Sequence, residues 1–148
     1  MLKRKSRTTQ QWPWGLLLIL LLVSVGKAAA NAPILIAHPD APVDSLERRE
    51  VRDIFLGEMS LWPNQERIAF ATLKARQVHE TFLGEYVGRT SSQYDIFWKK
   101  KVFSGQGRMP KSMDSPEAVI EFVANTPGAI GYLPSGTSPG NAKVIPVK

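Results

Sequence analysis

Apolar residues along the chain gather in short continuous runs that alternate with longer segments of helical periodicity. A short apolar run between turn-forming residues is typical of a buried strand. The clearest run is Pro33–Ala37, which the turn-like segment 38–42 ends. Runs of this kind predict four strands, at residues 33–37, 68–72, 129–133 and 143–147.

Between these runs, apolar residues recur every three or four positions, which is the spacing of one helix face. The spacing predicts four helices, at 46–56, at 75–87, from Ser91 or Ser92 onward, and from a Ser115 cap onward. Asp44, with Glu47 three residues later, is the expected cap of the first helix. The glycine-rich segment 104–108 is expected to be a loop.

Strands that alternate with helices indicate a layered α/β domain. Residues 31–148 suffice for one hydrophobic core, so we expect a single domain there. Trp62 and Trp98 fall where the pattern predicts packing. The large apolar residues expected in the core are Phe55, Phe82, Phe97, Val119, Ile130 and Tyr132.

The first 30 residues follow a different pattern. Lys3, Arg4, Lys5 and Arg7 precede an unbroken apolar run over 16–23, and Ala28-Ala29-Ala30 follows. This layout is typical of a secretory signal, and the run is shorter than the roughly 20 residues that a membrane-spanning helix needs. We therefore expect a periplasmic protein with the signal cleaved after Ala30. The alternative is an uncleaved signal that anchors the chain in the membrane.

The signal also carries most of the net positive charge. Of the 19 basic residues, five lie before residue 31 and no acidic residue does, which leaves 14 basic against 13 acidic residues. A nearly neutral domain has no global field that gathers nucleic acid, so we expect no nucleic-acid partner. The chain has no cysteine, which excludes disulfides and a lipid-modified cysteine anchor.

Three stretches carry a family resemblance: Val51–Gly57 with Trp62 after it, Phe103–Pro110 with its two glycines, and Pro127–Tyr132, which reads Pro-Gly-Ala-Ile-Gly-Tyr. Together they resemble the phosphate-type solute-binding proteins of ABC importers. A full protein of that family has two lobes that close on the anion, and this chain has residues for about one. The resemblance therefore implies a single lobe of the type II periplasmic-binding-protein fold, with a mixed central sheet and flanking helices.

The resemblance also implies phosphate, or a related small oxyanion, as the ligand. At the helix start after the second strand the family places a Ser-Gly-Thr run, and this chain has Thr72-Leu73-Lys74-Ala75-Arg76 instead. Lys74 and Arg76 are unfavourable at a helix start unless an anion binds there, and a guanidinium can hold an oxyanion through two hydrogen bonds. The alternative is that both point into water. Ser135-Gly136-Thr137 is interpreted as a flexible turn.

The loop that contains Gly105, Gly107 and Arg108 is the second candidate ligand site. Glycines free backbone N–H groups to face a ligand, and Arg108 adds a positive charge. The alternative is that the glycines serve only the turn. Because α/β sheets bind ligands at the carboxyl ends of their strands, we expect Arg76 and Arg108 to approach a common anion there.

No pattern suggests catalysis or a bound metal. His38 and His79 lie in unrelated contexts, and no glycine-flanked serine forms a nucleophile elbow. Asp53 lies among charged neighbours and fits a solvated helix face. We therefore expect a non-enzyme without a cofactor, which binds a small oxyanion. The alternative is an accessory module of a cell-envelope complex with a protein partner. A hydrolase ranks below both.

Overall fold

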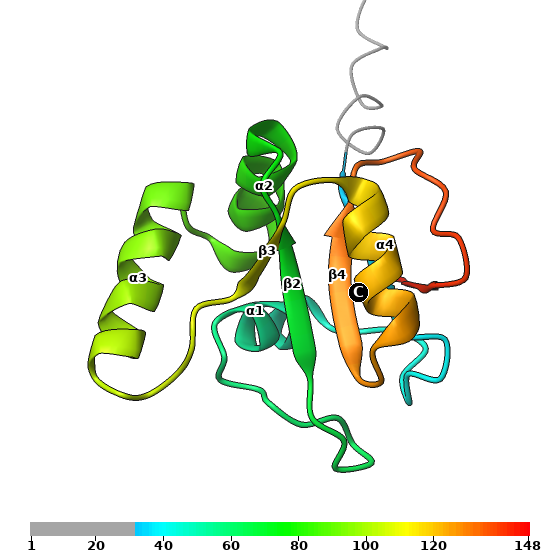
Figure 1. The fold of residues 1–148 in the computed structure, drawn as a ribbon, viewed down its shortest axis with the longest axis horizontal. Helices are drawn as coiled ribbons and strands as arrows, with labels where there is room; N and C mark the ends of the chain where they lie inside the picture. Colours follow the sequence, from blue (N-terminus) through cyan, green and yellow to red (C-terminus); the bar gives the residue numbers. More distant parts are fainter. Residues whose placement is uncertain (1–31) are drawn as a thin grey trace, which may run out of the picture.

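A five-stranded mixed sheet forms the centre of the domain (Figure 1). The computed structural model describes residues 32–148, so the predicted signal lies outside the described residues. The strands, in the order β3-β2-β4-β1-β5 across the sheet, are Lys111–Met113, Ala69–Leu73, Ala129–Leu133, Ile34–Ala37 and Lys143–Ile145. β2 runs parallel to β3 and β4, whereas β1 is antiparallel to β4 and β5. The expected mixed α/β architecture is confirmed.

Each predicted helix is present. They are α1 (Arg48–Phe55), α2 (Arg76–Phe82) with its π-helical continuation η2 (Leu83–Val87), α3 (Ser91–Phe103) and α4 (Pro116–Asn125). Ser115 caps α4 as predicted, because its hydroxyl accepts from the Ala118 amide at 3.2 Å. Within residues 32–148, no helix combines the length and apolar character that crossing a bilayer requires.

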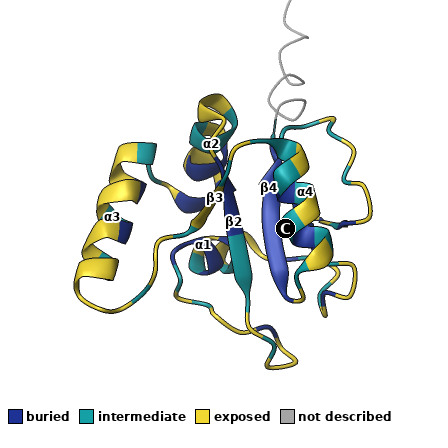
Figure 2. Cartoon of the chain, in the orientation of Figure 1, coloured by how far each residue is buried: buried dark blue, intermediate teal, exposed yellow. Residues whose placement is uncertain are grey.

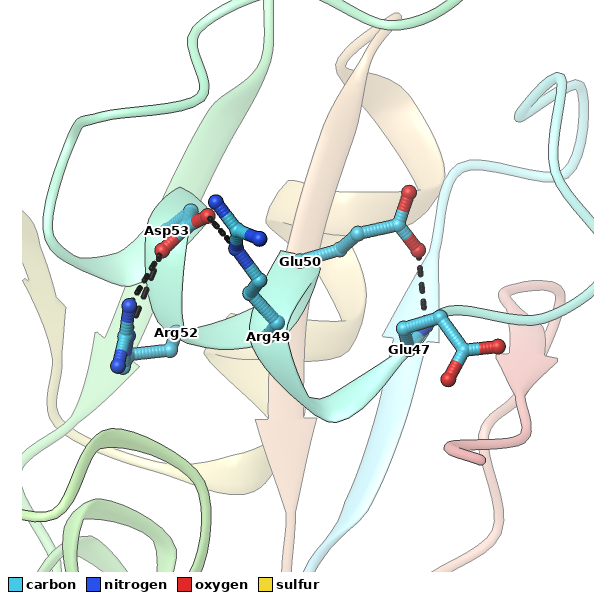
Figure 3. Close-up of polar contacts among 5 residues, drawn as sticks. All are labelled: Glu47, Arg49, Glu50, Arg52 and Asp53. Carbon is cyan, nitrogen blue, oxygen red and sulfur yellow. Dashed lines mark hydrogen bonds and ion pairs between the residues drawn. The ribbon is translucent and has the colours of Figure 1, made fainter.

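The caps of α1 and α3 differ from the prediction. α1 begins after Glu47, whose amide donates to the Glu50 carboxylate at 2.8 Å (Figure 3). Asp44 instead pairs with Lys143 of β5 at 2.6 Å, so a contact distant in sequence takes the carboxylate away from the helix. α3 begins after Thr90, which replaces the expected serine caps.

Helices cover both faces of the sheet, and side chains alternate along β4 to meet them. Gly131 faces α4, where an added Cβ would lie 2.8 Å from Val119. Tyr132 faces the other side and stacks on Phe82, with ring centroids 3.8 Å apart. β4 is therefore buried on both faces, as Figure 2 shows.

The expected core is confirmed at five of its six positions. The buried residues are Phe55, Phe82, Val119, Ile130 and Tyr132. The prediction is wrong for Phe97, which is only partly buried and packs against the edge of the core. Two cations contact its ring: the Arg89 guanidinium lies 4.9 Å from the ring centroid and the Lys101 ammonium 5.3 Å from it. Trp62 and Trp98 are buried as expected.

Candidate functional site

The carboxyl ends of β2, β3 and β4 meet at one edge of the sheet, because these three strands are parallel. Lys74 follows β2, Asp114 follows β3, and Pro134-Ser135 follows β4. α2 begins at Arg76, directly above this edge in Figure 1. The first group of predicted site residues therefore lies where α/β sheets commonly bind ligands.

The structure gives Thr72 and Lys74 partners within the domain. Thr72 is buried, and its hydroxyl donates to the carbonyl of Lys111 in β3 at 3.4 Å. The Lys74 ammonium pairs with Asp114 at 2.6 Å, and its amide donates to the Met113 carbonyl at 2.8 Å. Both partners of the ion pair are exposed, so it contributes at most about 1 kcal/mol to stability. The pair ties the ends of β2 and β3 together.

Arg76 is a second exposed cation at this edge. It is the first residue of α2, after an Ala75 cap that has no side-chain acceptor. Its guanidinium interacts electrostatically with Glu80, one turn later in α2. Because Arg76 is exposed, its donors can also meet an anion from solution.

The loop with Gly105, Gly107 and Arg108 closes the end of α3. The amide of Gly105 donates to the Val102 carbonyl, and Gly105 has a φ of 72°, which favours glycine. Gly107 packs closely, since an added Cβ would lie 3.2 Å from Trp98. These contacts account for both glycines through the turn. Arg108 is exposed.

The two predicted groups do not converge. Arg76 follows the carboxyl end of β2, whereas Arg108 precedes the amino end of the parallel strand β3. The prediction that Arg76 and Arg108 share one anion site is therefore wrong, because they lie at opposite ends of parallel strands. Both residues were expected at the carboxyl ends of the strands, because β3, which begins after Arg108, was not predicted from the sequence.

A buried polar chain beneath the carboxyl edge was missed in the sequence. The Leu73 amide donates to the Tyr132 hydroxyl at 3.0 Å, and that hydroxyl lies 2.6 Å from His79 Nδ1. Burial raises the pKa of Tyr132, so the hydroxyl keeps its proton. Desolvation lowers the pKa of His79, despite the opposing charges of Asp95 and Glu80. These polar contacts hold α2 against β2 and β4.

We expect the burial of His79 to make the stability of the domain depend on pH. Because the folded-state pKa of His79 lies below its unfolded value of 6.5, folding favours the neutral ring. The contribution is fully present above pH 6.5 and is lost as the pH falls through the lower, folded-state pKa. Urea unfolding at a series of pH values should show this decline in wild type and a shallower one in His79→Gln. Equal slopes in the two proteins would contradict it.

A pocket of about 150 Å³ lies beside α2 at the same edge. Gln77 and Thr81 of α2 line it together with Ser135, which follows β4. The structure therefore brings the Ser135-Gly136-Thr137 turn to the edge that carries Lys74 and Arg76. Within residues 32–148, no group of three potential metal-ligating side chains is found.

The outer face of α1 carries a cluster of charges, as predicted for Asp53 and its neighbours. Asp53 accepts two guanidinium groups, from Arg49 at 3.6 Å and from Arg52 at 3.4 Å (Figure 3). Arg49 and Arg52 therefore share one carboxylate.

No protein-family model and no curated protein matches the sequence. Solved structures share the fold. One is a Clostridium perfringens protein that was assigned as a phosphate ABC transporter substrate-binding protein and solved with bound phosphate. It is 18% identical to this chain, with a TM-score of 0.52. The match covers 79% of this chain and 45% of that one.

Two further structures agree. An ABC-type phosphate transport receptor from Vibrio cholerae is 16% identical with a TM-score of 0.55, over 79% of this chain and 46% of that one. PstS from Borrelia burgdorferi is 18% identical with a TM-score of 0.53, over 80% and 47%. This chain therefore spans less than half the length of these proteins. At such identities the matches show a shared fold.

Proposed function

We propose that this protein is exported and that its domain binds a small oxyanion such as phosphate at the carboxyl edge of β2, β3 and β4. One observation carries the proposal: the fold is shared with phosphate-binding receptors, one of which was solved with bound phosphate. The expected residues are Arg76 and Lys74, the two exposed cations that follow β2.

The contacts at this edge favour weak binding. Arg76 offers a planar pair of N–H donors that suits an oxyanion. Lys74 offers an ammonium, but Asp114 neutralises it at 2.6 Å and also repels an incoming anion. Binding at one lobe leaves part of the anion in water. We therefore expect affinity in the millimolar range, where about 4 kcal/mol of binding free energy suffices.

Replacing Arg76 with alanine should weaken phosphate binding by about 1.5–3 kcal/mol, the range for hydrogen bonds to charged groups. Isothermal titration with phosphate and with sulfate measures this change. The melting temperature should stay nearly constant, because Arg76 is exposed. Arg108→Ala is the matched control, since Arg108 lies at the other end of the strands.

Two outcomes would contradict the edge site. If phosphate and sulfate both fail to bind at millimolar concentration, the domain has no oxyanion site of this kind. If Arg108→Ala loses affinity and Arg76→Ala does not, the anion binds at the loop of Gly105 and Gly107 instead.

The second candidate function is an interaction module of a cell-envelope complex. The Lys74–Asp114 pair favours it, because this pair occupies donors at the place where the resembled family grips its ligand. The domain would then use its surface for a protein partner and not for transport. For either function, a product that keeps residues 12–25 and is found in the membrane fraction would contradict the predicted cleavage of the signal and the periplasmic location.

A further inference from the structure

A groove lies away from the strand edge, between the end of α1, the turn at 87–89 and the face of α3. Its volume is about 680 Å³, more than four times that of the pocket beside α2. Three separate segments of the chain form its walls. The lining residues that matter below are Arg52, Leu56, Arg89, Ile96, Phe97 and Lys100.

Positive charge dominates the groove. Arg52, Arg89 and Lys100 line it, and Glu58 is the acidic residue among the described lining residues. Arg52 shares its carboxylate partner with Arg49 (Figure 3). In the part of the chain that the structure describes, no ion pair is recorded for Arg89 or Lys100. This local excess of cations contrasts with the nearly neutral balance after residue 30.

Apolar groups lie among these cations. Leu56 and Val87 are buried in the groove, and Ile96 is 54% exposed on its α3 side. Phe97 presents a ring over which the Arg89 guanidinium is held, a cation–π contact that fixes the charge in place. The groove therefore suits a ligand that combines negative charge with apolar side chains.

The same face of α3 continues beyond the groove. Ile96, Lys100 and Phe103 are separated by four and then three residues, so they follow one face of the helix. Phe103 is 96% exposed, and Figure 2 shows that most of the outer surface of α3 is exposed. Large exposed apolar side chains in line with a groove are typical of a protein-binding surface. A ligand that covers Phe103 as well as the groove is larger than a small anion.

We propose that the groove between α1 and α3 docks an acidic segment of a partner protein whose apolar side chains recur at helical spacing. Carboxylates of the segment would meet Arg89 and Lys100, and its apolar side chains would cover Ile96, Phe97 and Phe103. A flat bilayer reaches a convex surface but cannot contact the three walls of a groove, which favours a protein segment. The proposal is independent of oxyanion binding, since Arg76 does not line the groove.

The probe is a fluorescein-labelled synthetic peptide rich in glutamate, with leucines every three or four positions. The purified protein, expressed from the full chain, is added to the peptide, and fluorescence anisotropy gives the affinity. Lys100→Glu should weaken binding at least about tenfold, because like charges then meet in the groove. Lys99→Glu makes the same change of charge outside the groove and should weaken binding less than about threefold.

Apolar contact is tested in the same way. Ile96→Ser should weaken binding severalfold, whereas Val144→Ser, at a 45% exposed position on β5, should not. A peptide with lysine in place of glutamate should not bind. Phosphate titration of Lys100→Glu should match wild type, so this proposal and the oxyanion proposal fail separately.

Several results would overturn the docking site. The proposal is wrong if the glutamate peptide does not bind or if the lysine peptide binds equally well. It is also wrong if Lys99→Glu and Lys100→Glu lose the same affinity for the peptide. Binding to anionic phosphatidylglycerol vesicles that Lys100→Glu abolishes, without peptide binding, would assign the surface to a membrane. Self-association that Lys100→Glu abolishes would assign the groove to a second copy.

Discussion

Replacing Phe82 with alanine is expected to lower the free energy of unfolding by about 3–5 kcal/mol. Phe82 is fully buried at the end of α2, where its ring stacks on Tyr132 at 3.8 Å and meets Phe55 at 4.7 Å. Alanine would leave a cavity among aromatic rings that cannot all move inward. Equilibrium urea unfolding followed by circular dichroism measures the change.

Phe103→Ala is the matched control, because it removes the same side chain from a position that is 96% exposed. We expect a change within about 0.5 kcal/mol there, as for surface substitutions generally. A loss below about 1 kcal/mol at Phe82 would contradict the packing of α2 on the sheet. The two variants together separate burial from the loss of an aromatic ring.

Gly128→Ala is expected to cost more than about 2 kcal/mol, since strain and a clash add at this position. Gly128 has a φ of 73°, and an added Cβ would lie 2.1 Å from the carbonyl oxygen of Arg67. Its own carbonyl accepts from Trp62 Nε1 at 3.0 Å and from the Ala69 amide at 3.1 Å. Movement away from Arg67 would therefore break contacts that begin the β2–β4 pairing.

Gly136→Ala is the control for backbone strain alone. Its φ is 78°, and an added Cβ meets nothing within 4 Å. The αL conformation then costs roughly 1–2 kcal/mol without a clash. Thermal unfolding of both variants would show the difference, and equal losses would mean that Arg67 yields easily.

The parts of the fold predicted from sequence are those that local patterns determine. Continuous apolar runs predicted the inner strands β1, β2 and β4, because strands inside a sheet are covered on both faces, and they also predicted β5 at the edge. Helical spacing at Val78, Phe82 and Tyr86 predicted the segment that became α2 and η2. The spacing could not distinguish the π-helical turn from an α-helix.

The elements that were missed depend on partners distant in the chain. β3 comprises Lys111, Ser112 and Met113, which have no apolar alternation and are largely exposed. It is a strand because its backbone pairs with β2 at the edge of the sheet. Asp44 failed as a cap for a similar reason, since Lys143 of β5 takes its carboxylate.

The places of the predicted site residues in the fold could be predicted only in part, and their contact with a ligand stays a prediction. Lys74 and Arg76 do lie at the carboxyl edge, because both follow a correctly predicted strand. Arg108 lies elsewhere, since the undetected strand β3 reverses the assumed position of its loop. His79 looked unrelated to any site, and only the fold brings Tyr132 to its ring. No sequence motif indicated the groove beside α3, because residues from three separate segments form it.

The position of β1 inside the sheet sets the order in which the domain can assemble. β1 pairs with β4 on one side and β5 on the other, and both come from the last part of the chain. Residues 34–37 can therefore pair only after residues 129–145 have been made. Pairing between such distant segments is slow compared with helix formation. The helices between these segments can form earlier, but the sheet can close around β1 only after residues 129–145 have been made.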